Sequence, residues 1–211
     1  MPALHTGLYA ITDPNLLAAK RLFSAVEAAL NGGTRVIQYR DKHASPSDQL
    51  IHARQLVELC ERFNAQLIIN DDLELCLHSG AHGVHLGRSD GDIRQARKQL
   101  GPDLILGVTC HDNLEYAQEC IEAGVDYCAF GRIFPSLTKP AAPHCSIEVL
   151  QQACRLPIPI VAIGGINLDN IGSLMHTPIH CAAVIHGLFS SKQIEATARQ
   201  FQTHFSYRKQ V

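Results

Sequence analysis

The chain has 211 residues, of which 46% are hydrophobic, and its formal net charge is −2 at pH 7 with a pI near 6.6. This composition allows one sizeable core and excludes a general attraction to nucleic acid or to an anionic membrane surface. The N-terminal residues lack the pattern of a signal peptide, and no apolar run is long enough to cross a bilayer. We expect a soluble, cytoplasmic protein, and the sequence leaves open whether it forms a homo-oligomer.

Eight short apolar runs have the length and composition of buried strands. They cover residues 8–12, 36–39, 67–69, 83–86, 104–108, 127–130, 160–163 and 182–185. Segments with helical spacing lie between and after these runs, with apolar faces such as Ile93/Ala96/Leu100, Leu114/Ala117/Ile121 and Ile194/Ala198/Phe201/Phe205. Alternating strands and helices indicate a parallel sheet. Eight such units in this length favour a single (β/α)8 TIM barrel that spans residues 1–211.

Helix start and stop signals support this division. The segment 31–33 (Asn-Gly-Gly) is expected to end the first helix, and the segment 45–48, with Ser45, Pro46 and Asp48, to begin the second. Gly124 is expected just beyond the end of the fifth helix. Asp112, with Glu115 three residues later, has the spacing of a capping box at the start of that helix.

Eight cysteines are spread along the chain, and no two of them are closer than eight residues. This spacing fits neither a zinc-binding CxxC pattern nor a disulfide-rich scaffold. The sequence therefore predicts reduced, mostly buried thiols.

Positively charged side chains follow the second predicted strand, in the sequence Gln38-Tyr39-Arg40-Asp41-Lys42. Strand alternation sends Gln38, Arg40 and Lys42 in the same direction. A guanidinium and an ammonium group side by side suit the oxygens of a phosphate. A solvated loop with an ion pair to Asp41 would explain the same residues.

Two aspartates follow the third and fourth predicted strands. The carboxyl ends of parallel strands open onto the ligand-binding face of such a fold, so Asp71 and Asp90 are expected to face one cavity. Carboxylate oxygens are the ligands that Mg²⁺ prefers, which makes the pair a candidate magnesium site. The alternative is helix capping, by Asp71 or Asp72 for one helix and by Asp90 for a helix beginning near Asp92.

Thr109, Cys110 and His111 end the fifth predicted strand. Thr109 could hydrogen-bond a ligand, and His111 could transfer a proton. Cys110 has the position of a nucleophile, but no partner base is evident, and an inert thiol is the simpler reading. His82 and His85 are expected to have structural roles.

A proline-bounded segment follows the sixth predicted strand and contains Ser136, Thr138 and Lys139. Two hydroxyl groups and an ammonium group fit an anion-binding loop, although an ordinary surface turn has the same composition.

Glycines end the last two predicted strands, in Gly164-Gly165 and in Ile185-His186-Gly187. At this position of a barrel, backbone N–H groups can approach a phosphate. A pair of glycines also serves as a simple turn.

Taken together, these motifs resemble the thiamine-phosphate synthase family over nearly the whole chain. The segments that carry the resemblance are residues 9–13, 38–42, 69–71, 83–90, 136–139 and 162–166. Each is unspecific alone, but their order and spacing together are not. The resemblance implies a Mg²⁺-dependent transferase that joins 4-amino-2-methyl-5-(diphosphooxymethyl)pyrimidine to a thiazole phosphate. The products would be thiamine phosphate and diphosphate, formed by a dissociative alkyl transfer.

The resemblance also implies a role for individual residues. Asp71 and Asp90 would bind Mg²⁺. The pyrimidine diphosphate would be held by Gln38, Arg40, Lys42, Asn70, Thr109 and Lys139. The thiazole phosphate would be held by Ser136, Thr138, Gly165, Ile185 and His186. Arg40, Lys42 and Lys139 would act catalytically by neutralising the departing diphosphate, so that no protein nucleophile is required.

The chain departs from the common family pattern at four positions. Thr109 stands where serine is usual and Ser136 where threonine is usual, so both keep a hydroxyl group. Arg88 replaces the usual glutamine. His186 replaces a serine, so the side-chain contact with the thiazole phosphate at this position is expected to differ. The backbone N–H group at this position is kept.

Three other functions share part of this pattern. A thiazole tautomerase of the same barrel type would use His111 as acid or base, but it needs neither the Asp71/Asp90 pair nor Lys139. A phosphosugar epimerase or isomerase would share only the fold and a phosphate site. A non-catalytic protein that binds thiamine precursors would be favoured by loss of a metal ligand or of Arg40, and the sequence retains them.

Overall fold

The computed structural model describes residues 3–17, 19–136 and 143–206. Its eight strands run parallel, each pairs with the next, and the last pairs with the first, which closes the barrel. The strands are β1 (Gly7–Ile11), β2 (Val36–Tyr39), β3 (Gln66–Asn70), β4 (Gly83–Leu86), β5 (Ile105–His111), β6 (Tyr127–Phe130), β7 (Ile160–Ile163) and β8 (Cys181–Val184). The predicted TIM barrel is therefore confirmed.

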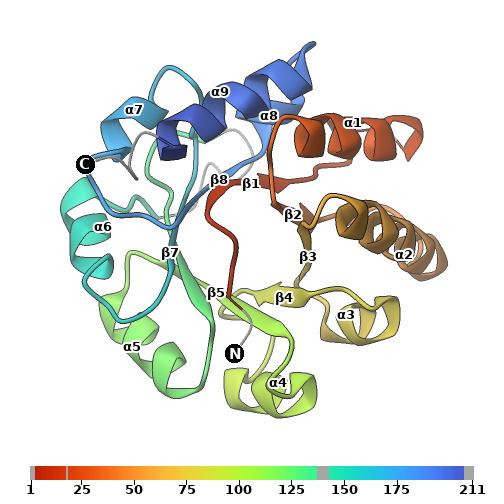
Figure 1. The fold of residues 1–211 in the computed structure, drawn as a ribbon. Helices are drawn as coiled ribbons and strands as arrows, with labels where there is room; N and C mark the ends of the chain where they lie inside the picture. Colours follow the sequence, from red (N-terminus) through yellow and green to blue (C-terminus); the bar gives the residue numbers. More distant parts are fainter. Residues whose placement is uncertain (1–2, 18, 137–142, 207–211) are drawn as a thin grey trace.

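The helices surround the strands (Figure 1). They are α1 (Ala19–Asn31), α2 (Pro46–Arg62), α3 (Leu73–Ser79), α4 (Ile93–Leu100), α5 (Leu114–Glu122), α6 (Ile147–Ala153), α7 (Ile171–Leu174), α8 (His186–Phe189) and α9 (Ile194–Ser206). The C-terminal α9 packs against α1 and β1, so the last helix covers the place where the sheet closes.

Most of the predicted helix boundaries are confirmed. Ser45 caps α2 by accepting a hydrogen bond from the Asp48 N–H group, and Gly124 follows α5 with a φ of 90°. The predicted capping box at Asp112 is wrong. Asn113 caps α5 instead, through a hydrogen bond of 2.8 Å from the Tyr116 N–H group to its side-chain oxygen. An amide oxygen caps as well as a carboxylate, so the start of the helix lies one residue later.

Buried side chains form two layers. One lies between the sheet and the helices and contains the outward-facing strand residues together with the apolar helix faces. The other fills the barrel and includes Tyr9, Ile68, Tyr127 and Val161. Because side chains alternate along a strand, continuously apolar strands supply both layers.

Seven of the cysteines are buried free thiols, as predicted: Cys60, Cys76, Cys110, Cys120, Cys128, Cys145 and Cys181. Within the described part of the chain, no helix has the length and apolarity needed to cross a membrane.

Candidate active site

A cavity of about 620 Å³ lies at the carboxyl ends of the strands. This volume is typical of a small-molecule site. It is lined by every predicted site residue that the structure describes: Gln38, Arg40, Lys42, Asn70, Asp71, Asp90, Thr109, Ser136, Gly165, Ile185 and His186. Thr138 and Lys139 lie outside the described residues. The structure thus gathers in one cavity residues from seven different strands or the loops that follow them.

The two aspartates of the predicted metal pair face the same cavity. Asp71 follows β3 with a φ of 64°, and its N–H group donates a hydrogen bond of 2.8 Å to the carbonyl of His85 on β4. Asp90 folds back so that its Oδ2 accepts a hydrogen bond of 2.7 Å from the Gly87 N–H group. A Cβ atom at Gly87 would lie 2.8 Å from that oxygen, so glycine makes this return possible.

The capping alternative is confirmed for Asp72 and is wrong for Asp71 and Asp90. Asp72 caps α3 by accepting a hydrogen bond from the Leu75 N–H group, and Asp92 caps α4 by accepting one from the Gln95 N–H group. Each helix is therefore capped by the neighbouring aspartate. Asp71 has a left-handed backbone, which is strained for a residue with a side chain and is typical of functional sites.

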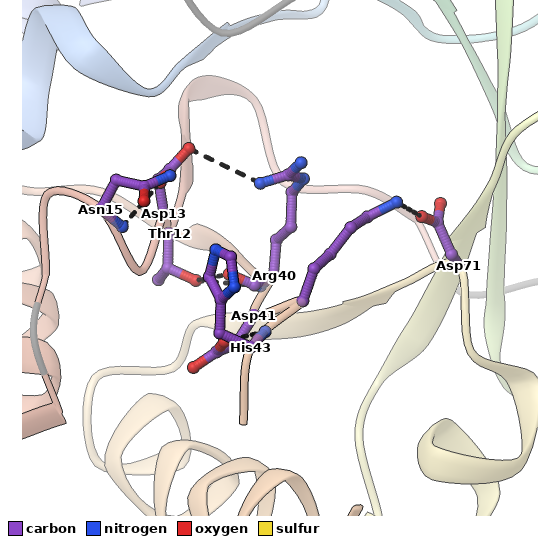
Figure 2. A network of polar contacts seen from close by, with 8 residues as sticks. Thr12, Asp13, Asn15, Arg40, Asp41, His43 and Asp71 are labelled. Atoms are coloured by element: carbon purple, nitrogen blue, oxygen red, sulfur yellow. Dashed lines mark hydrogen bonds and ion pairs between the residues drawn. The ribbon is translucent and has the colours of Figure 1, made fainter. Parts of the chain in front are cut away.

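Lys42 contacts Asp71 directly. Its Nζ lies 3.1 Å from Oδ2 of Asp71, and the dashed line that ends at Asp71 in Figure 2 marks this contact. Partial burial is the largest single influence on the pKa of Asp71 and acts to raise it, but the hydrogen bonds with Lys42, Asp90 and Asn70 and the charge of Lys42 together outweigh it. The pKa of Asp71 is therefore lower than its usual value, and the carboxylate stays ionised at neutral pH. Asp71 and Asp90 both line this cavity.

This pair fits Mg²⁺ better than a metal held entirely by protein. Among residues 3–17, 19–136 and 143–206, no group of three or more histidine, cysteine or acidic side chains is arranged to hold a metal. Mg²⁺ commonly takes one or two carboxylates from the protein and completes its shell with water and substrate phosphates. Asp71 and Asp90 supply the hard oxygen ligands that this arrangement needs.

Arg40 is held by the end of the first strand. Its backbone N–H group donates a hydrogen bond of 2.9 Å to the Thr12 hydroxyl group, which in turn donates to the Arg40 carbonyl. Its Nη1 lies 3.5 Å from Oδ2 of Asp13, whose Oδ1 accepts two hydrogen bonds from Asn15 (Figure 2). Asp41 accepts hydrogen bonds from the backbone N–H groups of His43 and Ala44, and its predicted pairing with the neighbouring cations is not observed. Asp13 is a positioning residue that sequence reasoning missed, although it follows a predicted strand.

Of the residues predicted to hold the thiazole phosphate, those that the structure describes lie on the β6, β7 and β8 side of the cavity. Gly165 has a φ of 65°, and a Cβ atom there would overlap the backbone oxygen of Pro135. Glycine therefore lets the loop after β7 approach the loop that carries Ser136. Ile185 and His186 follow β8 directly.

A chain of hydrogen bonds at the buried end of the cavity joins five strands, and we call it the floor chain. Gln38 Nε2 donates to the Tyr9 hydroxyl group at 2.8 Å, and Tyr9 is 2.8 Å from the Tyr127 hydroxyl group. Tyr127 is 2.8 Å from His85 Nδ1, and His85 Nε2 is 2.8 Å from the Thr109 hydroxyl group. All five residues line the cavity.

Sequence reasoning missed the middle of the floor chain. A structural role was expected for His85, and its side chain also lines the cavity and contacts Thr109. His82 does have a structural role, since its Nδ1 accepts a hydrogen bond from the Leu67 N–H group. The sequence feature that could have pointed to Tyr9, His85 and Tyr127 is their polar side-chain atoms within otherwise apolar strands.

The end of β5 is irregular where it meets the cavity. The register with β6 shifts between Thr109 and His111, and His111 has a φ of 55°. The bulge leaves both side chains on the cavity, while Cys110 is buried behind them. Hydrogen bonds with the thiols of Cys120 and Cys128, together with burial, raise the pKa of Cys110, in keeping with the inert thiol expected there.

Comparison with known proteins supports one family. The family model described as Thiamine monophosphate synthase matches residues 8–188. The chain is 50% identical over 203 residues to a thiamine-phosphate synthase from Alcanivorax borkumensis (94% of each chain covered). It is 47% identical over 205 residues to one from Marinobacter nauticus (96% of this chain and 92% of that protein).

A solved structure gives the same result. Thiamine phosphate pyrophosphorylase from Pyrococcus furiosus superposes with a TM-score of 0.88 at 30% identity, and 96% of each chain is covered. A structure described as native KDPGal, at 14% identity and a TM-score of 0.73, shares the fold alone. The chain therefore belongs to the thiamine-phosphate synthase family, and it is a transferase of thiamine biosynthesis.

Proposed function

We propose that this enzyme joins 4-amino-2-methyl-5-(diphosphooxymethyl)pyrimidine to a thiazole phosphate, in a Mg²⁺-dependent reaction that releases diphosphate. The observation that carries the proposal is the pair Asp71 and Asp90 at one cavity, beside the cations Arg40 and Lys42. A site for a diphosphate needs cations, and a site for Mg²⁺ needs carboxylates. The two sets of groups meet here.

The proposed chemistry requires a stabilised leaving group. The C–O bond between the pyrimidine methylene and the diphosphate breaks, and its electron pair leaves with the diphosphate. Arg40 and Lys42 would donate hydrogen bonds to the diphosphate oxygens and stabilise the charge that grows there. Asp71 and Asp90 would hold Mg²⁺, which supplies further charge neutralisation when it is bound. Lys139, which lies outside the described residues, is proposed as a third cation.

The second half of the reaction requires positioning. The lone pair of the thiazole nitrogen forms the new C–N bond with the methylene carbon. Ser136, Gly165, Ile185 and His186 would hold the thiazole phosphate so that this nitrogen faces the methylene, which replaces a bimolecular encounter by a local step. No protein nucleophile takes part, in keeping with the inert Cys110.

Proton transfer by His111 alone is a less well supported function. His111 lines the cavity, as a thiazole tautomerase would require. That reaction gives no role to the metal pair or to the cations beside it. The curated relatives that match most of the chain are thiamine-phosphate synthases.

The test is a product assay with single omissions. Purified enzyme with both substrates and Mg²⁺ should form thiamine phosphate and diphosphate, and omission of Mg²⁺ or of either substrate should abolish this. Asp71→Asn should slow the reaction about 100-fold or more, because a charged ligand is lost. Asp72→Asn is the matched control, since asparagine also caps a helix and the activity should persist. Turnover without metal, or an unaffected Asp71→Asn variant, would refute the proposal.

A further inference from the structure

The floor chain contains more hydrogen-bonding groups than the proposed reaction uses. Tyr9 and Tyr127 are almost fully buried, at 1% and 0% exposure, in an otherwise apolar barrel interior. A Cβ atom at Gly107 would overlap the ring of Tyr127, so a glycine on β5 makes room for this tyrosine. An interior filled by aliphatic side chains would be simpler to build. The protein instead places the polar atoms of the floor chain there. The two ends of the floor chain, Gln38 and Thr109, both line the cavity.

The proton order, that is, which partner donates in each hydrogen bond of the floor chain, follows from the hydrogen bond between Gln38 and Tyr9. Gln38 Nε2 donates a hydrogen bond to the Tyr9 hydroxyl group. Tyr9 therefore accepts from Gln38 and donates its own hydroxyl proton in a hydrogen bond to Tyr127. Tyr127 then donates to His85 Nδ1, which must be unprotonated. The proton of the neutral imidazole is therefore on Nε2, and it is donated to the Thr109 hydroxyl group.

The opposite order leaves a buried group unpaired. If His85 carried its proton on Nδ1, the Tyr127 hydroxyl group would accept it and donate to Tyr9. Tyr9 would then accept from both Gln38 and Tyr127, and its own proton would have no acceptor in the chain. An unpaired hydroxyl proton at this depth is costly, so the order that begins at Gln38 is favoured. Burial also raises the pKa of both tyrosines, so each keeps its proton.

We propose that Tyr9, Tyr127 and His85 are positioning residues that fix which end of the floor chain donates a hydrogen bond to the substrate and which end accepts one. At one end, Gln38 uses its N–H group on Tyr9 and offers its carbonyl oxygen as an acceptor. At the other end, Thr109 accepts from His85 and offers its hydroxyl proton as a donor.

This polarity fits an aminopyrimidine. The ring carries an exocyclic amino group, which donates, and ring nitrogens, which accept. The assignment of the ligand rests on the proposed function, whereas the proton order of the chain does not. A site whose buried donors and acceptors are fixed in advance discriminates strongly against a ligand with the reverse pattern.

The first experiment reads the proton order directly, without any turnover. ¹⁵N NMR of the purified protein at neutral pH assigns the protonated nitrogen of His85, whose signals are identified by their loss in His85→Gln. We expect a neutral ring with the proton on Nε2, and a mixture of the two tautomers in Tyr127→Phe. A wild-type ring protonated on Nδ1, or on both nitrogens, would overturn the inference.

The second experiment asks whether Tyr127 acts through Thr109. We expect Tyr127→Phe and Thr109→Val each to raise the KM for the pyrimidine substrate about tenfold, the effect of one hydrogen bond, with kcat within about twofold of wild type. Thr109→Ser keeps the hydroxyl group and should behave like wild type. The KM for the thiazole phosphate should not change.

Combining the two substitutions separates positioning from a merely structural role. Because both remove the same hydrogen bond to the substrate, the double variant should be about tenfold impaired, not the hundredfold expected of independent effects. Tyr39→Phe is the matched control: it removes a 3.1 Å hydrogen bond between a buried tyrosine and His52, neither of which lines the cavity. Tyr39→Phe should change neither KM, alone or combined with Thr109→Val. Independent effects of Tyr127→Phe and Thr109→Val would overturn the inference.

The two experiments separate the inference from the proposed function. If the enzyme makes no thiamine phosphate but His85 carries its proton on Nε2, the proton order holds and the proposed function fails. If the enzyme is active but His85 has the other tautomer, the inference fails and the proposed function holds.

Discussion

The aspartates at the strand ends have two different roles, facing the cavity or capping a helix. The position of each aspartate, not its residue type, decides which role it has. Asp71 and Asp72 are adjacent, yet one faces the cavity and the other caps α3. Asp90 and Asp92 divide the same two tasks at the start of α4. The sequence alone left capping open for Asp71, Asp72 and Asp90, because a carboxylate before a helix fits both roles, and it did not identify Asp92 as a cap. The backbone of Asp71, with its positive φ, was not visible in the sequence.

Lys42 illustrates a side chain whose contribution to stability is small. The Lys42 side chain, which pairs with Asp71, is 57% exposed, and solvent screens such exposed ion pairs well. We predict that Lys42→Met changes the free energy of unfolding by less than about 0.5 kcal/mol, measured in urea. The same variant should slow diphosphate release at least about tenfold, because a cation beside the leaving group is lost.

Arg62→Met is the matched control for Lys42→Met. Arg62 lies 3.7 Å from Glu27 in an exposed ion pair, and it does not line the cavity. Its substitution should leave both stability and turnover near those of wild type. If Lys42→Met were as active as Arg62→Met, Lys42 would have no part in the reaction.

Among the elements, the strands were predicted most accurately. The runs 36–39, 83–86, 127–130 and 160–163 match β2, β4, β6 and β7 residue for residue. A strand buried on both faces is a continuous apolar run, and polar residues mark its ends clearly. The start of α5 was missed by one residue, because Asp112 and Asn113 are both good capping residues and only the backbone chooses between them.

The amino ends of the strands are held by a separate polar cluster. Arg97 on α4 donates hydrogen bonds to the carbonyls of Gly101, Leu104 and Gly124, and it pairs with Asp126, whose side chain is only 4% exposed. Asp126 also accepts a hydrogen bond of 2.8 Å from the backbone of β5. This cluster fastens α4 to the strands at the end of the barrel that is associated with stability rather than catalysis.

Loss of the Asp126 charge should therefore destabilise the fold without changing the chemistry. We predict that Asp126→Asn lowers the free energy of unfolding by about 3–5 kcal/mol, because the half-buried Arg97 loses the charge of its buried partner. Denaturant unfolding measures this, and the kcat of the folded fraction should stay at the wild-type value. Asp103→Asn is the control. Asp103 is exposed in the loop between α4 and β5, so its substitution should change the free energy of unfolding little. A loss of less than about 1 kcal/mol for Asp126→Asn would contradict the role of this ion pair.

At the scale of the whole molecule, closure of the barrel creates the site. The cavity takes residues from strands far apart in the sequence, and the floor chain runs through β2, β1, β6, β4 and β5. Because carboxyl strand ends converge in a parallel barrel, the sequence could predict which residues would meet there. Contacts across the barrel interior could not be predicted, because they depend on strand register and on the tilt of each strand.

We propose that Asp71 and Asp90 together hold a divalent cation beside the diphosphate. The most direct measurement is a calorimetric titration of Mg²⁺ into the protein with inorganic diphosphate present, for wild type, Asp90→Asn and Asp92→Asn. We predict that Asp90→Asn binds Mg²⁺ at least about tenfold more weakly than wild type, because a carboxylate ligand is lost. Asp92→Asn should bind as wild type does, because asparagine keeps the helix cap. Equal affinity in wild type and Asp90→Asn would contradict the claim.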